Sequence, residues 1–278
     1  MTDKTVLVTD YTWSSTAPEA EVLARVGARL LVAETGAEDE LRALVPQADA
    51  ILTCFKKVSA EVVRAGEKLQ VIGRYGIGVD NIAVDEATRR GIPVTNVPAY
   101  CLDEVAEHAL ALILAGARNV CRYDRAVHDG NWALQTGMPM YRVRGQTLGV
   151  VGFGKIGQTL AAKARGLGLR VLAYDAYIPP HIARQAGAEL VAFDDLLTQS
   201  DFISIHTPLT PETRGLLNRE TLRKMKRNAF LVNTSRGGVI DTEALTEALQ
   251  NEWIAGAGLD VFDPEPLPRD HPLLSHPG

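Results

Sequence analysis

The stretch from Leu148 to Asp175 limits the possible folds of this chain more than any other. Its sequence is LGVVGFGKIGQTLAAKARGLGLRVLAYD. An apolar run of strand type, Leu148–Phe153, leads into glycines at G-x-G-x-x-G spacing, and Lys155–Leu167 then has the apolar spacing of a helix. A second strand, Arg170–Tyr174, is followed directly by an acid. This order of strand, glycine turn, helix, strand and acid predicts a β-α-β unit of a parallel sheet.

Each glycine of the turn is expected to have its own role. Gly152 makes the tight turn, Gly154 lets the backbone approach a pyrophosphate, and Gly157 lets the helix pack close to its strand. The N-terminus of the helix would then direct N–H groups at the phosphates. The alternative is a structural glycine turn that binds nothing. The complete β-α-β context favours a dinucleotide.

The acid at the end of the second strand predicts which dinucleotide binds. Asp175 lies at about the 20-residue distance at which an acid hydrogen-bonds the adenosine ribose. Its carboxylate would repel a 2′-phosphate, and the next residues, Ala176 and Tyr177, supply no arginine to offset that repulsion. The sequence therefore predicts NAD as the cofactor.

Strand and helix patterns alternate through the rest of the chain, which predicts parallel sheets covered on both faces. The other expected strands are Thr5–Thr9, Arg29–Ala33, Ala50–Cys54, Gln70–Arg74, Pro93–Val97, Glu189–Val191, Phe202–His206, Ala229–Asn233 and Ala255–Asp260. The other expected helices are Glu19–Val26, Glu38–Val45, Ala60–Ala65, Asp85–Arg89, Leu102–Ala117, Val120–Asn131, Ala183–Ala186, Asp194–Thr198, Glu220–Met225 and Thr242–Gln250.

The helix expected at Leu102–Ala117 is apolar on more than one face, which predicts that it is buried between domains or between subunits. Its His108 is either a ligand or a core or interface residue, and the second interpretation is favoured. The polar loop Trp132–Gln146 is expected to form part of a cleft wall.

Composition excludes several classes of function. At 278 residues, 46% hydrophobic and 23% charged, the chain has the composition of a soluble protein and room for two domains. Its net charge of −5 comes without a basic run, which argues against a nucleic-acid or anionic-membrane surface. Cys54, Cys101 and Cys121 are scattered, so we expect reduced thiols, no disulfide framework and no metal site. With neither a leader at the N-terminus nor a membrane-length apolar run, a cytoplasmic protein is expected.

The loops after several strands carry candidate binding residues, because ligands of such sheets bind beyond the carboxyl ends of the strands. The turn Tyr75–Asn81 offers glycine N–H groups to a carboxylate, or else its Asp80 and Asn81 cap the next helix; both interpretations are compatible. Lys56 and Lys57 are equally compatible with an anion contact and with a solvated loop.

Arg236 and Glu265 follow strands of the nucleotide-binding half, where a nicotinamide ring is expected. An arginine there could hold a carboxylate and polarise a neighbouring carbonyl, and a glutamate beside a histidine would raise the pKa of that histidine. The alternative for each residue is a surface ion pair or a helix cap.

Five motifs together resemble the D-isomer-specific 2-hydroxyacid dehydrogenase family. They are GFGKIG followed by Asp175, HTPLTPET at His206–Thr213, NTSRGGVID at Asn233–Asp241, GAGLDVFDPEP at Gly256–Pro266 and RYGIGVDNI at Arg74–Ile82. They cover nearly the whole chain in the expected order. Within the family, VLVTDYTW and VPAYCLDEVAEHALAL resemble the branch that includes phosphoglycerate-dehydrogenase-like proteins and C-terminal-binding-protein corepressors.

The resemblance implies an α/β fold with two doubly wound parallel-sheet domains. A flavodoxin-like substrate domain would span residues 1–99 and a Rossmann NAD-binding domain residues 100–270, often with dimerisation through the latter. Residues 271–278 would begin the return to the substrate domain, with the remainder absent from the sequence.

The resemblance also implies the site residues. Arg236 would bind the 2-oxo acid, Glu265 would partner a catalytic histidine, and Ile77 and Gly78 would meet the substrate carboxylate. The cofactor-binding residues would be Gly152, Gly154, Lys155, Ile156, Gly157, Asp175, His206, Thr207, Pro208, Thr213, Thr234 and Asp260.

The sequence departs from the family pattern after Glu265. The family's acid/base histidine belongs to a Thr-Pro-His element, which does not occur before Gly278; His271 and His276 fall in the preceding loop pattern and receive no role. We expect either a chain that is cut short or given in part, or a natural short form that binds NAD without turnover.

The expected function is NAD-dependent interconversion of a 2-oxo acid and a D-2-hydroxy acid by hydride transfer in an interdomain cleft. The alternative is a non-catalytic NAD-binding protein of corepressor or scaffold type. Phosphorylated hydroxy acids, glyoxylate, hydroxypyruvate and larger oxo acids all stay open as substrates.

Overall fold

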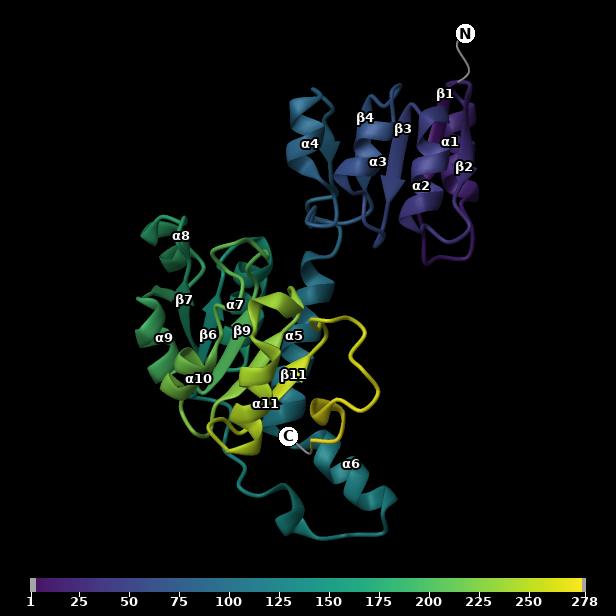
Figure 1. Ribbon diagram of the computed structural model, residues 1–278. Helices are drawn as coiled ribbons and strands as arrows, with labels where there is room; N and C mark the ends of the chain where they lie inside the picture. Colours follow the sequence, from purple (N-terminus) through teal and green to yellow (C-terminus); the bar gives the residue numbers. More distant parts are fainter. Residues whose placement is uncertain (1–3, 277–278) are drawn as a thin grey trace. The chain divides into compact units, whose positions relative to one another are not determined.

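The chain divides into two compact units, with the boundary between Tyr100 and Cys101. A computed structural model describes residues 4–276. Two expectations extend to residues outside this range. The expected absence of a leader concerns residues 1–3, and the expected return segment includes residues 277–278. Each unit contains one parallel sheet with helices packed on it (Figure 1).

The sheet of the first unit has the strand order β2-β1-β3-β4-β5, and every pairing is parallel. This is the 2-1-3-4-5 order of flavodoxin-like folds. Its strands are β1 (Lys4–Val8), β2 (Ala28–Val32), β3 (Ala50–Thr53), β4 (Val71–Arg74) and β5 (Val94–Thr95). Its helices are α1 (Ala17–Ala24), α2 (Glu38–Leu44), the 3-10 helix η1 (Val45–Gln47), α3 (Ala60–Ala65) and α4 (Val84–Arg89).

The main core of the first unit lies between the sheet and α2, α3 and α4. Leu7, Ile51 and Ile72, at the centres of three neighbouring strands, are fully buried together with Leu41 of α2 and Val62 of α3. Helix α1, by contrast, contributes no buried residue. The main cluster of buried apolar side chains in this unit therefore lies on the face toward α2, α3 and α4.

The sheet of the second unit has the strand order β11-β10-β9-β6-β7-β8, again with parallel pairings throughout. Numbered within the unit, this is 3-2-1-4-5-6 read from the other edge, the order of dinucleotide-binding Rossmann folds. Its strands are β6 (Thr147–Val151), β7 (Arg170–Tyr174), β8 (Glu189–Leu190), β9 (Phe202–Ile205), β10 (Phe230–Asn233) and β11 (Gly256–Leu259).

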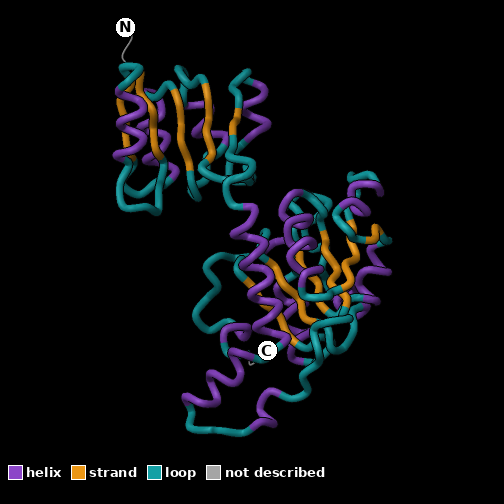
Figure 2. Tube along the Cα trace, turned by 180° about the vertical axis from the view of Figure 1, so that it is seen from behind, coloured by secondary structure: helices purple, strands orange, loops and turns teal. Residues whose placement is uncertain are grey.

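Helices cover both faces of this sheet, as the tube view also shows (Figure 2). The helices are α5 (Leu102–Ala117), α6 (Val120–His128), α7 (Lys155–Gly166), α8 (Pro180–Gln185), α9 (Phe193–Gln199), α10 (Arg219–Lys224) and α11 (Thr242–Gln250). The short 3-10 helices are η2 (Leu134–Gly137), η3 (Gly237–Val239) and η4 (Pro272–Leu274).

Alternating side chains of β6 divide the core of the second unit into two layers. Leu148 and Val150 pack with α5 and α7, whereas Val151 packs with α9, α10 and α11. Gly149 occupies the face toward α9, where a Cβ would lie 2.6 Å from the Leu196 side chain. Strand β6 is thus buried on both faces, as expected for a central strand of a parallel sheet.

Helix α5 has the predicted bounds but is not buried on all sides. Ala106, Ala109 and Ile113 are buried against the sheet and α7. Glu107 and His108 are exposed in the chain by itself. His108 is therefore not a core residue of the described chain, and its position at an interface stays a prediction.

Two other predicted elements are shorter in the structure. The strand predicted at Pro93–Val97 covers only β5, because the Asn96 side chain and the Val97 N–H bond to the loop after β4. The helix predicted to reach Asn131 ends at His128, since Gly130 has a φ of +78° and stops the helix there.

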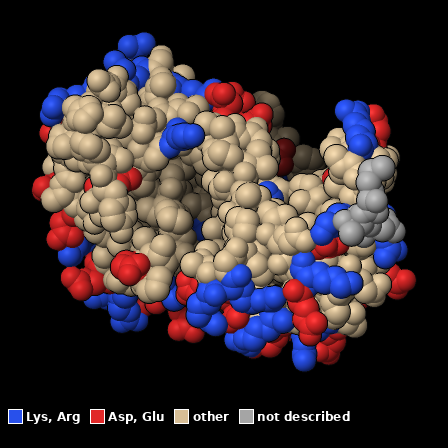
Figure 3. Space-filling model, turned by 90° about the horizontal axis from the view of Figure 1, so that it is seen from above, with Lys and Arg blue, Asp and Glu red and all other residues tan. Residues whose placement is uncertain are grey.

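Lys and Arg are interspersed with Asp and Glu on the face shown in Figure 3. This mixed pattern agrees with the mild net charge of −5. Among helices formed by residues 4–276, none is long and apolar enough to cross a membrane.

Candidate active site

The glycine turn between β6 and α7 is closed by contacts that only glycine permits. Gly152 has a φ of +88°, and a Cβ there would lie 2.7 Å from the carbonyl carbon of His206. A Cβ at Gly157 would lie 2.5 Å from the carbonyl oxygen of Gly152. The turn therefore lies tightly between the start of α7 and the end of β9.

Gly154 differs from both of these glycines. A Cβ added there would meet nothing within 4 Å, and the residue is exposed. Gly154 is also the N-cap of α7, and no described side chain caps this helix. The first-turn N–H groups, next to Lys155 and Ile156, therefore face open space, which fits a pyrophosphate.

Asp175 follows β7 and points back at the glycine turn. Its Oδ2 accepts a hydrogen bond of 2.8 Å from the N–H of Phe153. Its Oδ1 accepts hydrogen bonds from the N–H groups of Tyr177, at 2.8 Å, and Ile178, at 3.2 Å. A carboxylate has about four acceptor positions, so this one can also accept from a ribose hydroxyl.

Two buried hydroxyls lie just beyond the ends of neighbouring strands. Thr207 follows the end of β9 and Thr234 follows β10, and the Oγ1 atom of each is buried without a hydrogen-bond partner among the described residues. Buried polar atoms are rarely left unpaired. Together with the open space at Gly154, these two orphaned hydroxyls fit a bound dinucleotide.

His206 follows β9 directly and lies beside the glycine turn. Its Nε2 lies 2.9 Å from Ser204 Oγ, and burial lowers the pKa of His206 to about 4. The imidazole is therefore neutral at physiological pH and fills space beside the turn without adding charge.

Hydrogen bonds of threonines within the loop after His206 stabilise its conformation. Thr213 donates a hydrogen bond of 2.7 Å to the carbonyl oxygen of Pro208 and accepts one of 2.8 Å from the N–H of Thr210. Thr213 therefore shapes this loop, whatever it also contributes to a cofactor.

Arg236 is held in the loop after β10 by the buried Asn233. The Asn233 Nδ2 donates to the Arg236 carbonyl oxygen at 2.9 Å, and its Oδ1 accepts from the N–H of Ser235 at 3.0 Å. The Arg236 guanidinium donates to the Ser235 carbonyl oxygen at 2.7 Å.

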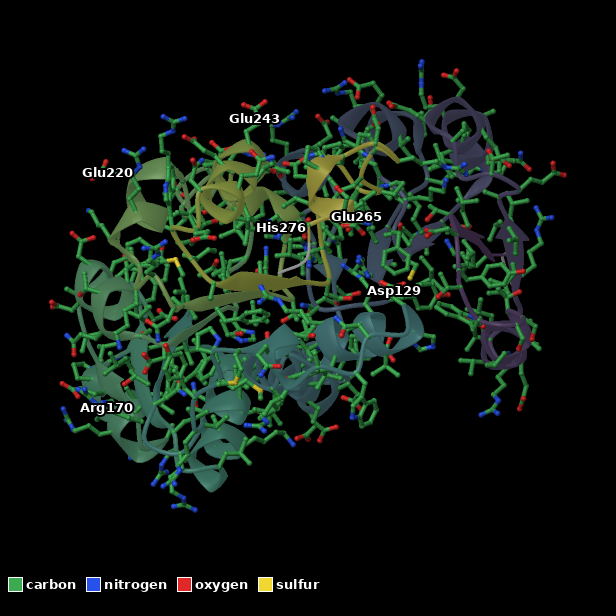
Figure 4. All side chains as sticks on the ribbon, turned by 90° about the horizontal axis from the view of Figure 1, so that it is seen from below. Asp129, Arg170, Glu220, Glu243, Glu265 and His276 are labelled. Carbon is green, nitrogen blue, oxygen red and sulfur yellow. The ribbon has the colours of Figure 1, made fainter. Side chains whose placement is uncertain are left out.

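The loop that carries Arg236 packs against the segment that leads to Glu265. A Cβ at Gly237 would lie 1.9 Å from the backbone carbonyl carbon of Phe262, so these two backbones are in direct contact. The Glu265 carboxylate is exposed and accepts a 3.3 Å hydrogen bond from the Phe262 N–H (Figure 4). The two candidate catalytic residues thus come from loops that contact each other.

Asp260, which follows β11, has a partner that the sequence did not indicate. His108 Nε2 lies 3.5 Å from Asp260 Oδ1, and both side chains are about half exposed. Helical spacing alone gives no sign of this pair, since its members are 152 residues apart.

Ile77 and Gly78 belong to the first unit, in the turn after β4. The carbonyl oxygen of Ile77 accepts a 2.8 Å hydrogen bond from Asn96 Nδ2. Asn81 does not cap the next helix, because the N-cap of α4 is Ala83 and no described side chain caps it. Asn81 instead bonds to the loop after β3, a role that sequence analysis missed.

No three His, Cys, Asp or Glu side chains within residues 4–276 form a group that could hold a metal ion.

Comparison with known proteins gives a family match over much of the chain. Residues 110–278 match the model of the D-isomer specific 2-hydroxyacid dehydrogenase NAD binding domain. The chain is 47% identical over 234 residues to a glyoxylate reductase of Korarchaeum cryptofilum, an alignment that covers 83% of this chain and 70% of the relative.

Two further similarities extend this result. A D-3-phosphoglycerate dehydrogenase of Mycobacterium leprae is 45% identical over 236 residues, covering 84% of this chain but 44% of the relative. The structure of Aquifex aeolicus D-lactate dehydrogenase, complexed with NAD and lactic acid, is 31% identical with a TM-score of 0.83, and the match covers 94% of this chain and 77% of that one.

Proposed function

The chain belongs to the D-isomer-specific 2-hydroxyacid dehydrogenase family and is an NAD-dependent oxidoreductase, and we propose that it reduces a small 2-oxo acid to the corresponding 2-hydroxy acid. One observation carries the proposal. The loop of Arg236 packs on the segment of Glu265 in the same unit as the glycine turn and Asp175. A cation for the substrate and a carboxylate that can partner a catalytic histidine therefore lie on the unit that is expected to hold NAD.

In this proposal Arg236 holds the 2-oxo acid. Its guanidinium donates to the carboxylate and to the carbonyl oxygen, which makes the carbonyl carbon more electrophilic. NADH, when bound, supplies the hydride to that carbon. Gly154, the first turn of α7 and Asp175 hold its pyrophosphate and ribose. Thr234 and Asp260 lie along its nicotinamide side, and Thr207 lines the cofactor.

Glu265 orients the group that delivers a proton to the carbonyl oxygen. Its carboxylate is exposed and bonds only weakly to the Phe262 N–H, so it can accept a hydrogen bond from an imidazole. In the family pattern that imidazole belongs to the histidine of a Thr-Pro-His element. A neighbouring carboxylate favours the protonated form of such a histidine.

The first unit, residues 1–99 in the sequence prediction, is assigned to the substrate. The glycine turn with Ile77 and Gly78 offers backbone N–H groups to the substrate carboxylate. The second unit, from Cys101 onward, binds NAD. Hydride transfer then requires that both units act on one substrate molecule, as in an interdomain cleft.

The substrate that we propose is an unphosphorylated 2-oxo acid of glyoxylate or hydroxypyruvate size. Support comes from the glyoxylate reductase similarity, where the alignment covers 70% of the relative, compared with 44% for the phosphoglycerate dehydrogenase.

The test is NADH oxidation against a panel of 2-oxo acids with wild type, Arg236→Lys and Arg236→Ala. We expect Arg236→Ala to reduce turnover by at least a hundredfold and Arg236→Lys to retain part of it, with NADH affinity unchanged in both. Equal turnover of wild type and Arg236→Ala would remove Arg236 from the mechanism. NADH binding without turnover of any 2-oxo acid, both by this chain and by a version extended through a Thr-Pro-His element, would favour a non-catalytic NAD-binding protein.

We also propose that the chain forms a homodimer through the second unit. Large apolar side chains are exposed along α6 and the loop that follows it: Val120, Val127, Trp132, Leu134, Met138 and Tyr141. A groove of about 910 Å³ lies alongside, lined by α5, α6, β11 and the end of α11. Apolar patches of this kind mark interaction sites, and a second copy of the chain would cover it.

Analytical ultracentrifugation tests the dimer. We expect wild type to sediment as a dimer and a Trp132→Asp/Leu134→Asp variant as a monomer. Trp132 is 90% exposed, so the substitution itself should not unfold the chain. Monomeric wild type at tens of micromolar would contradict the proposal.

A further inference from the structure

Asp10 follows β1, the neighbour of β3 in the sheet, and fixes the loop after β3. Its Oδ2 accepts from the Phe55 N–H at 2.7 Å, and its Oδ1 accepts from the N–H groups of Cys54 and Lys56 at 3.0 and 3.2 Å. Burial alone would raise the pKa of Asp10, but these bonds and one from the Thr9 hydroxyl outweigh it and lower the pKa. An ionised carboxylate therefore holds three consecutive N–H groups of this loop.

Asn81 holds the same loop from the other side. Its Nδ2 donates to the carbonyl oxygen of Lys56 at 2.9 Å and approaches that of Cys54 at 3.4 Å. Its backbone also pairs with this segment, because the Asn81 carbonyl oxygen accepts from the Val58 N–H at 2.8 Å. The N–H groups of the loop thus bond to Asp10, while its carbonyl oxygens bond to Asn81.

The orientation of the Asn81 amide is set by Arg74, the last residue of β4. Arg74 Nε donates to Asn81 Oδ1 at 3.0 Å, which directs Nδ2 at the loop after β3. The guanidinium also lies 5.8 Å from the centre of the Phe55 ring, a cation–π contact. Arg74 therefore contacts both Asn81 and the loop that Asn81 holds.

The space for this guanidinium comes from Gly76, in the turn that contains Ile77 and Gly78. A Cβ at Gly76 would lie 2.3 Å from an Nη atom of Arg74. The Gly76 backbone is also fixed from β5, because its carbonyl oxygen accepts from the Val97 N–H at 3.0 Å. Glycine at this position lets the turn lie directly on the Arg74 side chain.

We propose that Asn81, held by Arg74, is a positioning residue that couples the Phe55–Lys57 loop to the Gly76–Gly78 turn, so that the substrate-binding surface of the first unit is preformed. The inference rests on the proposed function, in which this turn receives the carboxylate of a 2-oxo acid. The Asn81 amide bonds to one loop through Nδ2 and to the arginine under the other loop through Oδ1.

The first test separates the two functions of the amide in the full chain. Asn81→Asp keeps an acceptor for Arg74 but loses the donor to Lys56. We expect KM for the 2-oxo acid to rise at least tenfold, while kcat changes less than threefold and the NADH dissociation constant stays unchanged. The matched control is Asn251→Asp at the C-cap of α11, whose Nδ2 also donates to a backbone carbonyl at 2.9 Å. An unchanged KM in Asn81→Asp would overturn the proposal.

The second test is a double-mutant cycle between Arg74 and Gly76. Gly76→Ala should raise KM because the new methyl group displaces the guanidinium. On the Arg74→Met background there is no guanidinium to displace, so Gly76→Ala should add less than a twofold further effect. Additive effects would mean that the turn does not depend on Arg74, which would overturn the proposal.

Amide hydrogen exchange gives a readout that needs no activity. In Asn81→Ala we expect faster amide exchange at Phe55, which lies in the loop after β3. We expect the same at Val97, whose N–H bonds to the Gly76 turn. The thermal midpoint of unfolding should stay within a few degrees of wild type. Faster exchange at only one of them would overturn the coupling. If wild type reduces no 2-oxo acid, the proposed function fails, while the exchange result still decides whether the loops are coupled.

Discussion

The carboxylate of Asp175 and the backbone N–H of Phe153 are joined by a hydrogen bond of 2.8 Å, although the two residues are 22 positions apart. This bond ties the end of β7 to the glycine turn after β6. The acid that is expected to face the adenosine ribose is therefore also part of the turn that is expected to face the pyrophosphate. The shape of the glycine turn and the expected preference for NAD therefore both involve the Asp175 side chain.

Replacing Asp175 should weaken NADH binding and relax the preference for NAD over NADP. In Asp175→Asn one oxygen still accepts from the backbone, but the negative charge that repels a 2′-phosphate is lost. We expect NADH affinity to fall about tenfold or more and the ratio of NADPH to NADH dissociation constants to shrink, measured by fluorescence titration. The control is Asp195→Asn, an exposed acid of α9. An unchanged ratio would separate Asp175 from cofactor choice.

Gly154 and Gly166, at the two ends of the α7 region, should respond differently to the same methyl group. At either position a Cβ meets nothing within 4 Å, so Gly154→Ala and Gly166→Ala should both fold. Gly154→Ala should lower NADH affinity about tenfold or more, because the methyl group would occupy the space of the pyrophosphate. Gly166→Ala should leave affinity unchanged and stabilise the helix by up to about 1 kcal/mol. Equal affinities would place the pyrophosphate elsewhere.

Local sequence patterns predicted most of this fold because parallel α/β units carry strong signals. The bounds of α3, α5, β7 and α11 agree with the predictions to the residue. The strand at Val94–Thr95 was predicted too long, since periodicity cannot tell a strand from an extended segment whose partners lie in a loop.

The parts of the site that sequence reasoning missed depend on contacts between distant residues. Asn81 fits a helix cap by position, yet its partners are Lys56 and Arg74. The pair of His108 and Asp260 likewise forms only when α5 packs beside β11. A motif such as RYGIGVDNI indicates that its asparagine has a function, but only the fold shows what the side chain contacts.

Gly237 should be more sensitive to substitution than its position in a loop suggests. A Cβ there would lie 1.9 Å from the Phe262 carbonyl carbon, and a backbone cannot yield as a flexible side chain can. Gly237→Ala should therefore separate the Arg236 loop from the Glu265 segment, with a loss of about 1 to 3 kcal/mol of stability.

We expect 2-oxo acid reduction by Gly237→Ala to fall more than tenfold at a temperature where the variant is fully folded, with NADH affinity largely kept. Steady-state kinetics and urea unfolding measure the two effects. Wild-type kinetics in the folded variant would show that the contact with Phe262 does not matter for the reaction.

Gly116 should report the packing of α5 on the sheet. A Cβ there would lie 2.5 Å from the ring of Phe230 in β10. Alanine favours a helix over glycine by about 1 kcal/mol, but overpacking costs about 1 to 3 kcal/mol, so Gly116→Ala should be destabilising overall. Phe230→Leu in the same chain should recover part of the loss. Urea unfolding of the two single variants and the double variant measures this coupling; strict additivity would contradict the contact.

His206 should make the protein less stable as the pH falls from 6.5 to 4. Burial lowers its pKa in the folded state from the ordinary 6.5 to about 4. Between these values the unfolded chain binds a proton that the folded chain does not, so the free energy of unfolding decreases as the solution is acidified. The part of the free energy of unfolding that depends on a neutral His206 is fully present above pH 6.5 and is lost by pH 4. The loss amounts to at most about 3 kcal/mol.

The measurement is urea unfolding of wild type and His206→Gln at steps of pH from 7.5 to 4. Glutamine can still hydrogen-bond the Ser204 hydroxyl, which lies 2.9 Å from the imidazole, but it has no proton to gain. The difference in free energy of unfolding between the two chains should therefore shift in favour of the variant only within this pH interval. A difference that is constant with pH would mean that His206 takes up its proton as readily in the folded chain as in the unfolded one.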